Sequence, residues 1–251
     1  MNYGLQLYSV RDSMEKDVNA TLKAVAEMGY KQVEFAGFFG HSAEDIKAML
    51  DHYGLVCCST HTGCNEIFDH LEDTVKYHKI IGNKNLIIPS GWIDTKEHLD
   101  HFIDGINRVQ PILEAEGIAL HFHNHSGEFM ANQDGQIPHT ELEKRTHILF
   151  QLDTFWVFNA GLDPVATIER LKHRVKTIHL KDGIPAAKSE DNRAHGKSVG
   201  SGEAPVLAVR KKAIELGLNI VIESEGLQPT GLEEVKRCID FLKEQDAKDG
   251  N

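Results

Sequence analysis

The sequence predicts one closed (β/α)8 barrel, an α/β fold in which eight parallel strands are surrounded by helices. Short apolar runs alternate eight times with longer amphipathic stretches, and no linker rich in Pro, Gly or Ser divides the 251 residues. Eight such units in a chain of this length are typical of a closed barrel. No glycine-rich GxGxxG follows the first strand, as it would in a dinucleotide-binding open sheet. We therefore expect a single domain over residues 1–251.

The strands are predicted from short apolar runs, and the helices from apolar residues that recur every three or four positions. The expected strands cover residues 4–9, 32–36, 55–61, 85–90, 118–124, 147–153, 175–182 and 219–225. The expected helices cover residues 19–30, 42–54, 72–82, 99–117, 163–173, 204–217 and 231–245. Several helices end in a glycine, such as Gly54 and Gly82, which can adopt the left-handed conformation that closes a helix.

Polar and ionisable side chains gather at the C-terminal ends of these strands. In a barrel all of these ends meet at one face, where the active site of such folds lies. A single carboxylate there is more often a helix N-cap or a salt-bridge partner. Several buried charges at one mouth would be costly unless a divalent cation bound them, so their number favours a metal site. The residues are Glu34, His61, His123, His125, Asp153, His179, Lys181, Glu223 and Glu225.

The fifth strand carries the densest signal, the run LHFHNHSGEF at residues 120–129. Alternation along a strand places His121, His123 and His125 on one face. Glu128 follows the next turn and could fold back toward the barrel mouth. A hydrogen-bonded polar cluster is the alternative interpretation of these histidines. His121 lies deeper and fits a core position better than a ligand position.

Several ordered motifs over nearly the whole chain resemble those of the sugar phosphate isomerase/epimerase superfamily, which has a xylose isomerase-like TIM barrel. The motifs are GLQLYSVRD, VEFAGFFG, STH, HNHSGEF, DTFWVFNAGLDP, IHLKDG, VGSGEAP and IVIESEG. The resemblance implies that Glu128, Asp153, His179 and Glu223 bind one divalent metal ion. The choice among Mn, Mg, Co, Zn and Fe stays open. Similar epimerases carry a glutamate directly at the end of the fifth strand, whereas this chain has histidines there. A fifth-strand histidine could therefore replace Glu128 as the metal ligand.

The resemblance also implies a metal-dependent sugar isomerase or epimerase that acts on a small sugar or keto-sugar. An enediolate would form next to a metal-bound carbonyl, and a base would move the proton. The candidate catalytic residues are His123, His125, Glu128 and Glu223. The candidate substrate-binding residues are Glu34, His61, Lys181, Arg193 and Glu225. A dehydratase or lyase of an inosose or 3-keto-glycoside, and a non-catalytic sugar-binding barrel, stay open as alternatives.

Charge and hydropathy restrict the partners of this chain. Its formal net charge of -11 opposes a nucleic-acid partner, because nucleic-acid affinity comes mainly from Lys and Arg that neutralise phosphates. No run of about eighteen apolar residues and no secretory leader pattern occurs, so we expect no membrane association and a cytoplasmic protein. The expected partner is a small-molecule sugar, and formation of a homo-oligomer stays open.

Overall fold

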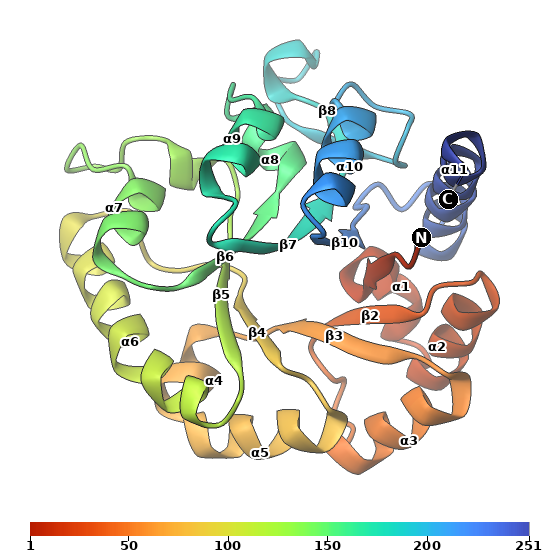
Figure 1. The fold of residues 1–251 in the computed structure, drawn as a ribbon, viewed down its shortest axis with the longest axis horizontal. Coiled ribbons are helices and arrows are strands. Elements are labelled where there is room, and N and C mark those ends of the chain that lie inside the picture. Colours follow the sequence, from red (N-terminus) through yellow and green to blue (C-terminus); the bar gives the residue numbers. More distant parts are fainter. Residues whose placement is uncertain (251) are drawn as a thin grey trace.

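A computed structural model, which describes residues 1–250, contains a closed barrel of eight parallel strands (Figure 1). The strands lie in the order β1-β10-β7-β6-β5-β4-β3-β2. Their bounds are β1 Gly4–Gln6, β2 Gln32–Ala36, β3 Val56–His61, β4 Asn85–Ile88, β5 Ala119–His123, β6 Leu149–Asp153, β7 Val175–Leu180 and β10 Asn219–Ile222. Parallel pairing of β1 with β10 closes the barrel. The structure thus confirms the predicted barrel.

Helices connect the strands and cover the outside of the barrel (Figure 1). Those that the sequence predicts are α2 Val18–Glu27, α3 Ala43–Tyr53, α5 Leu71–Ile81, α6 Lys96–Ala115, α9 Pro164–Leu171, α10 Val206–Glu215 and α11 Gly231–Asp249. Those that it does not predict are α1 Arg11–Met14, α4 Cys64–Asp69, α7 Pro138–Arg145 and α8 Thr154–Asn159. Gly54 and Gly82 follow α3 and α5 with left-handed φ angles of 65° and 76°. No helix of residues 1–250 combines the length and apolar character that crossing a membrane requires.

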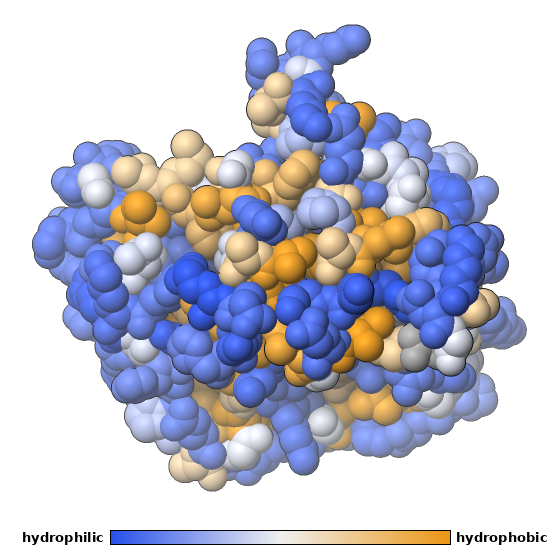
Figure 2. Space-filling model, turned by 45° about the horizontal axis from the view of Figure 1, so that its top comes forward, coloured by the Kyte–Doolittle hydropathy of each residue, from blue (hydrophilic) through white to orange (hydrophobic). Residues whose placement is uncertain are grey.

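Two stretches differ from the predicted strands. The chain leaves the barrel after β7, and β8 (Asp182–Ile184) pairs antiparallel with β9 (His195–Lys197). The segment between them projects from the barrel at the top of Figure 1, and the projection is largely hydrophilic in Figure 2. Residues 7–10 form a 3-10 turn instead of extending β1, because the Gln6 side chain accepts a hydrogen bond from the Tyr8 backbone N–H at 2.9 Å.

The barrel strands present different chemistry on their two faces. On β5, Phe122 packs against Phe102 of α6 with 5.6 Å between ring centroids, whereas His121 and His123 occupy the alternate positions. A continuous cluster of buried apolar side chains fills the space between strands and helices. Fully buried polar side chains such as Glu34 and Gln151 occupy other positions of the same strands. Each buried polar group requires a partner, and these partners build the site at the barrel mouth.

Candidate active site

Four buried side chains converge where β5, β6, β7 and β10 end. One ligand atom from each of His123, Asp153, His179 and Glu223 lies within 4.8 Å of the others. The Nδ1 atom of His179 lies 3.1 Å from Glu223 Oε2 and 4.0 Å from Asp153 Oδ2. We call these four residues the buried quartet. The structure thus brings together three of the four residues that the sequence proposes as metal ligands.

Glu128, the remaining proposed ligand, lies outside the buried quartet. Its Oε2 accepts a hydrogen bond from the backbone N–H of His125 at 2.9 Å, and its Oε1 lies 3.7 Å from His125 Nδ1. His123 holds the fifth-strand position in the quartet. The geometry therefore favours the alternative in which a fifth-strand histidine replaces Glu128.

The donor set of the buried quartet fits a divalent cation. Asp153 Oδ1 caps α8 by accepting hydrogen bonds from the backbone N–H groups of Phe155 and Trp156 at 2.9 and 3.0 Å. Asp153 Oδ2 is buried and has no hydrogen-bond partner among residues 1–250. A buried carboxylate oxygen without a hydrogen bond is costly, and coordination to a cation removes that cost. Two imidazoles and two carboxylates without a thiolate suit first-row divalent ions.

Glu34 of β2 anchors a hydrogen-bond network next to the buried quartet. Its Oε1 lies 2.6 Å from His179 Nε2 and accepts a hydrogen bond from Gln6 Nε2 at 2.7 Å. Its Oε2 accepts hydrogen bonds from Gln151 Nε2, at 2.6 Å, and from the Ser59 hydroxyl. Protein groups therefore occupy both oxygens of this proposed substrate-binding residue. A carboxylate on the second nitrogen of a metal-binding histidine fixes the tautomer and orientation of the ring.

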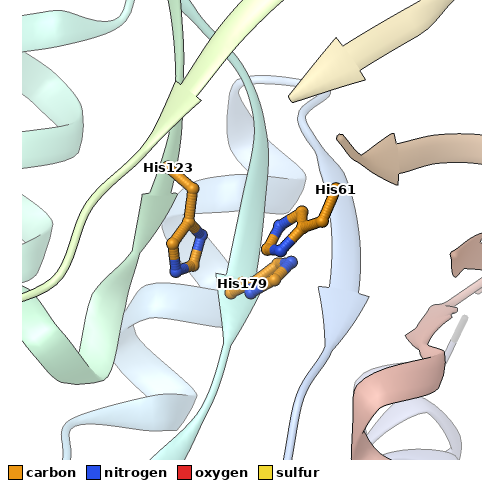
Figure 3. Close-up of side chains that lie close together, drawn as sticks. All are labelled: His61, His123 and His179. Atoms are coloured by element: carbon orange, nitrogen blue, oxygen red, sulfur yellow. The ribbon is translucent and has the colours of Figure 1, made fainter. Parts of the chain in front are cut away.

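Three imidazole rings lie together at the barrel mouth (Figure 3). The ring of His61 stacks on that of His179 with 5.3 Å between centroids, and the centroid of the His123 ring lies 4.8 Å from each of them. Gln151 joins two of the rings, because its Oε1 lies 2.8 Å from His61 Nε2 and 3.1 Å from His123 Nδ1. Sequence reasoning missed Gln151, although its place two residues before Asp153 puts both side chains on one strand face.

Lys181 is fully buried beside the quartet. Its Nζ lies 3.0 Å from Glu225, 3.2 Å from Glu223 and 3.7 Å from Asp153. The same atom lies 4.8 Å from the centroid of the Trp156 ring, within the range of a cation–π contact. Burial lowers the pKa of Lys181, but the carboxylates outweigh burial and raise it. Lys181 is therefore a fixed cation at the site.

Burial and charge together set the protonation of the quartet. Burial lowers the pKa of His179, but Glu34 and Glu223 outweigh burial and raise it to about 10. Burial raises the pKa of Asp153 to about 6. For Glu223, the charges of Lys181 and His179 overcome burial and hold the pKa well below its usual range. A cation can bind at the Nδ1 atom of His179 only after the ring loses one of its two protons, so we expect metal binding to release a proton.

The remaining proposed site residues lie at different distances from the quartet. His125 stands at its entrance, with 46% of its side chain exposed. Glu225 contacts Lys181, as described above. Arg193 is exposed between β8 and β9, and its backbone N–H donates to Ser189 Oγ at 2.9 Å. Within residues 1–250, no hydrogen bond or ion pair joins the Arg193 side chain to the quartet.

Solved structures of several other proteins share this fold. Two structures of a sugar phosphate isomerase/epimerase from Parabacteroides distasonis ATCC 8503 have TM-scores of 0.81 and 0.82 at 23% and 26% identity. The alignments cover 96% of this chain in both cases, and 93% and 97% of those chains. The probable 3-DHS dehydratase AsbF from Bacillus anthracis has a TM-score of 0.76 at 12% identity, over 97% of this chain and 99% of its own. The likenesses at 23% and 12% identity show the fold alone.

Curated relatives and a family model match the sequence itself. An inosose dehydratase from Geobacillus kaustophilus is 25% identical over 190 residues, which are 64% of this chain and 60% of that protein. Another inosose dehydratase, from Clostridium beijerinckii, is 24% identical over 106 residues, 42% of this chain and 36% of that protein. The matches therefore span less than two thirds of these relatives. The family model matches residues 22–245. The closed barrel and this match show that the chain belongs to the xylose isomerase-like TIM barrel family.

Proposed function

We propose that the protein is a metal-dependent enzyme that takes a proton from the carbon beside the ketone of a cyclic polyhydroxy compound, such as an inosose, and then eliminates water. The observation that supports this proposal is the buried quartet beside the cation Lys181, with an Asp153 oxygen that accepts no hydrogen bond. His123, Asp153, His179 and Glu223 would hold the metal ion. Bound there, a divalent cation would draw electrons from the ketone oxygen and acidify the neighbouring C–H bond.

In this proposal, His125 is the base. Its ring centroid lies 5.0 Å from that of His123, and its partly exposed side chain faces the entrance to the quartet. Burial lowers the pKa of His125, but the hydrogen bond and charge of Glu128 outweigh burial and raise it. An imidazole beside a carboxylate can take a proton from carbon and then donate that proton to the leaving group.

Elimination then completes the reaction. The electron pair of the broken C–H bond forms a carbon–carbon double bond, and the C–O bond on the adjacent carbon breaks. Protonated His125 gives its proton to the departing oxygen, which leaves as water. Lys181 donates a hydrogen bond to the ketone oxygen while negative charge builds there. With a 3-keto-glycoside, an alcohol would leave by the same steps.

Similarity to two inosose dehydratases supports elimination as the outcome. A second candidate is epimerisation or isomerisation, in which the proton returns to carbon and no C–O bond breaks. The Parabacteroides distasonis structure at 26% identity, named a sugar phosphate isomerase/epimerase, favours this candidate. Both candidates share the same first step and the same residues.

Incubation of the protein with manganese and scyllo-inosose in deuterated water, followed by NMR, tests the proposal. We expect an unsaturated product formed by loss of water. Deuterium on the ring carbon without loss of water indicates the epimerase instead. His125→Ala should lower kcat by about 10²- to 10⁴-fold, whereas His52→Ala, an exposed histidine on α3, should not change it. If no compound in a panel of ketoses and inososes undergoes dehydration or deuterium exchange, the result contradicts catalysis. The protein is then a sugar-binding barrel.

A further inference from the structure

We infer that the substrate carries a second ring: the ring with the ketone lies at the buried quartet, and a glycosidically linked ring lies in a groove beside the barrel mouth, against Trp92. This inference rests on the proposed function for the reacting ring. It names the substrate class as keto-glycosides. Three observations carry it: the size and position of the groove, the exposure of Trp92, and the continuity between the groove and the quartet.

The groove lies between the loop after β4 and the loop after β5. Its volume is about 770 Å³, and its lining includes Trp92, Asp94, His125 and Glu128. Ligand pockets of roughly 300–1,000 Å³ bury most of a drug-sized ligand. The groove therefore has room for a sugar ring.

Trp92 is the most exposed large hydrophobic side chain of residues 1–250, with a relative exposure of 79%. Its indole offers a flat apolar surface on which the C–H face of a sugar ring can pack. The ring of His98 lies 6.3 Å from it, and His98 Nδ1 lies 2.7 Å from Asp94 Oδ1. An aromatic face bordered by exposed polar groups suits a polyhydroxylated ring better than a hydrocarbon.

Hydrogen bonds between the two loops set the shape of the groove without a ligand. Asn132 Nδ2 donates to the carbonyl oxygen of Ile93 at 3.2 Å. The backbone N–H of Gln133 donates to the carbonyl oxygen of Asp94 at 3.0 Å. Both bonds join the loop after β5 to the loop after β4. A preformed groove lowers the entropic cost of ordering a bound ring.

His125 connects the groove to the reacting centre. It lines the groove, and its ring centroid lies 5.0 Å from that of His123 and 5.7 Å from that of Trp156. Trp156 in turn contacts Lys181. A substrate with one ring at the quartet and one on Trp92 passes His125, the residue that protonates the departing oxygen. The glycosidic oxygen then lies beside its proton donor.

The test compares scyllo-inosose, which has one ring, with a 3-keto disaccharide. Trp92→Ala should raise the KM for the disaccharide about tenfold, the scale of an aromatic packing contact, and leave the KM for the inosose unchanged. Trp92→Phe keeps an aromatic face and should largely retain the KM for the disaccharide. Ile112→Ala, which removes an exposed apolar side chain on the outer surface of α6, should change neither value.

NMR of the indole N–H groups gives a second readout. The signal of Trp92, identified by its loss in Trp92→Phe, should shift when the disaccharide is added and stay in place with the inosose. An unshifted signal together with a wild-type KM in Trp92→Ala overturns this inference, whether or not the inosose is dehydrated. A shifted signal without turnover of either compound contradicts the proposed function and leaves the second-ring site standing.

Discussion

Glu34 acts on the site through His179. Burial raises the pKa of Glu34, but the charges of His179 and His61 outweigh burial and lower it to about 2, so the carboxylate is ionised. An ionised Glu34 accepts the Nε2–H of His179 and leaves Nδ1, which faces Glu223, as the nitrogen that a cation can use. Glu34 is thus a positioning residue for a metal ligand.

Glu34→Gln should weaken binding of manganese by about 10- to 100-fold, because the amide no longer fixes the tautomer of His179. Isothermal titration of the purified protein with manganese measures this effect. Glu97→Gln, an exposed change in the first turn of α6, serves as the control. Equal manganese affinity in Glu34→Gln and the wild type contradicts the positioning role.

Lys181→Met separates metal binding from catalysis. The substitution removes the ammonium group from Asp153 and Glu223, which should retain or tighten manganese binding. The ketone oxygen loses its hydrogen-bond donor, so kcat for the inosose should fall by about 10²- to 10³-fold. Titration with manganese and steady-state kinetics measure the two quantities. A variant with normal kcat shows that Lys181 only balances charge.

Among the connecting elements, the segment after β7 depends on one carboxylate. Asp182 accepts hydrogen bonds from the backbone N–H groups of Gly183, Gly200, Gly202 and Ala204 at 2.8–3.0 Å. A Cβ atom at Gly202 would lie 2.3 Å from Asp182 Oδ1, so glycine is needed for this close approach. One side chain thus orders both β8 and the loop before α10.

Asp182→Ala should loosen this segment without unfolding the barrel, because four N–H groups lose their acceptor. Amide hydrogen exchange followed by mass spectrometry should show faster exchange over residues 182–204 and unchanged protection of β5. Glu190→Ala, an exposed change in the same projection, is the control. Unchanged exchange over residues 182–204 in Asp182→Ala contradicts this role.

Periodicity predicts the barrel well and its short helices poorly. Long strands and helices repeat a pattern over many residues, whereas α7 has eight residues and buries only Pro138, His139 and Leu142, too few positions to establish a period. The helix α8 begins at the residue after β6, so the sequence DTFWVFN continues the strand pattern without a break. Short elements of this kind take their conformation from the surrounding barrel.

The candidate site, like the fold, can be predicted from the sequence only in part. Asp153 and His179 lie at or near the ends of apolar strands, so the sequence places them at one mouth. Gln151 is a neutral residue inside a strand, and its role emerges only when β2 and β3 bring Glu34 and His61 beside it. The position of Glu128 depends on the turn after β5, which the sequence pattern does not specify.

For the whole molecule, the two ends of the chain lie close together (Figure 1), and one polar cluster joins them. The Tyr3 hydroxyl donates to Asp246 Oδ1 at 2.6 Å and accepts from Arg210 Nε at 2.8 Å. Arg210 also donates directly to Asp246. These residues belong to the start of the chain, α10 and α11, beside the seam where β1 pairs with β10. The cluster therefore joins the first and last parts of the barrel.

Asp246→Ala should lower the free energy of unfolding by about 3 kcal/mol, because buried Arg210 then keeps only the half-exposed Asp249 as an acidic partner. Urea denaturation at neutral pH measures this change. Asp240→Ala on the same helix breaks only the exposed pair with Lys236 and should cost less than about 1 kcal/mol. A loss for Asp246→Ala as small as that of Asp240→Ala shows that the cluster contributes little to barrel closure.

The same cluster should make the stability of the barrel sensitive to acid. Burial raises the pKa of Asp246, but hydrogen bonds from Tyr3 and Arg210 outweigh burial and lower it. The folded-state pKa therefore lies below the unfolded value, so the contribution of Asp246 is complete above the unfolded value and disappears as the pH falls through the folded value. Urea titrations between pH 7 and pH 3 should therefore show that the stability difference between wild type and Asp246→Ala shrinks as the pH falls. A constant difference across those titrations means that Asp246 stabilises the seam by packing and not by its charge.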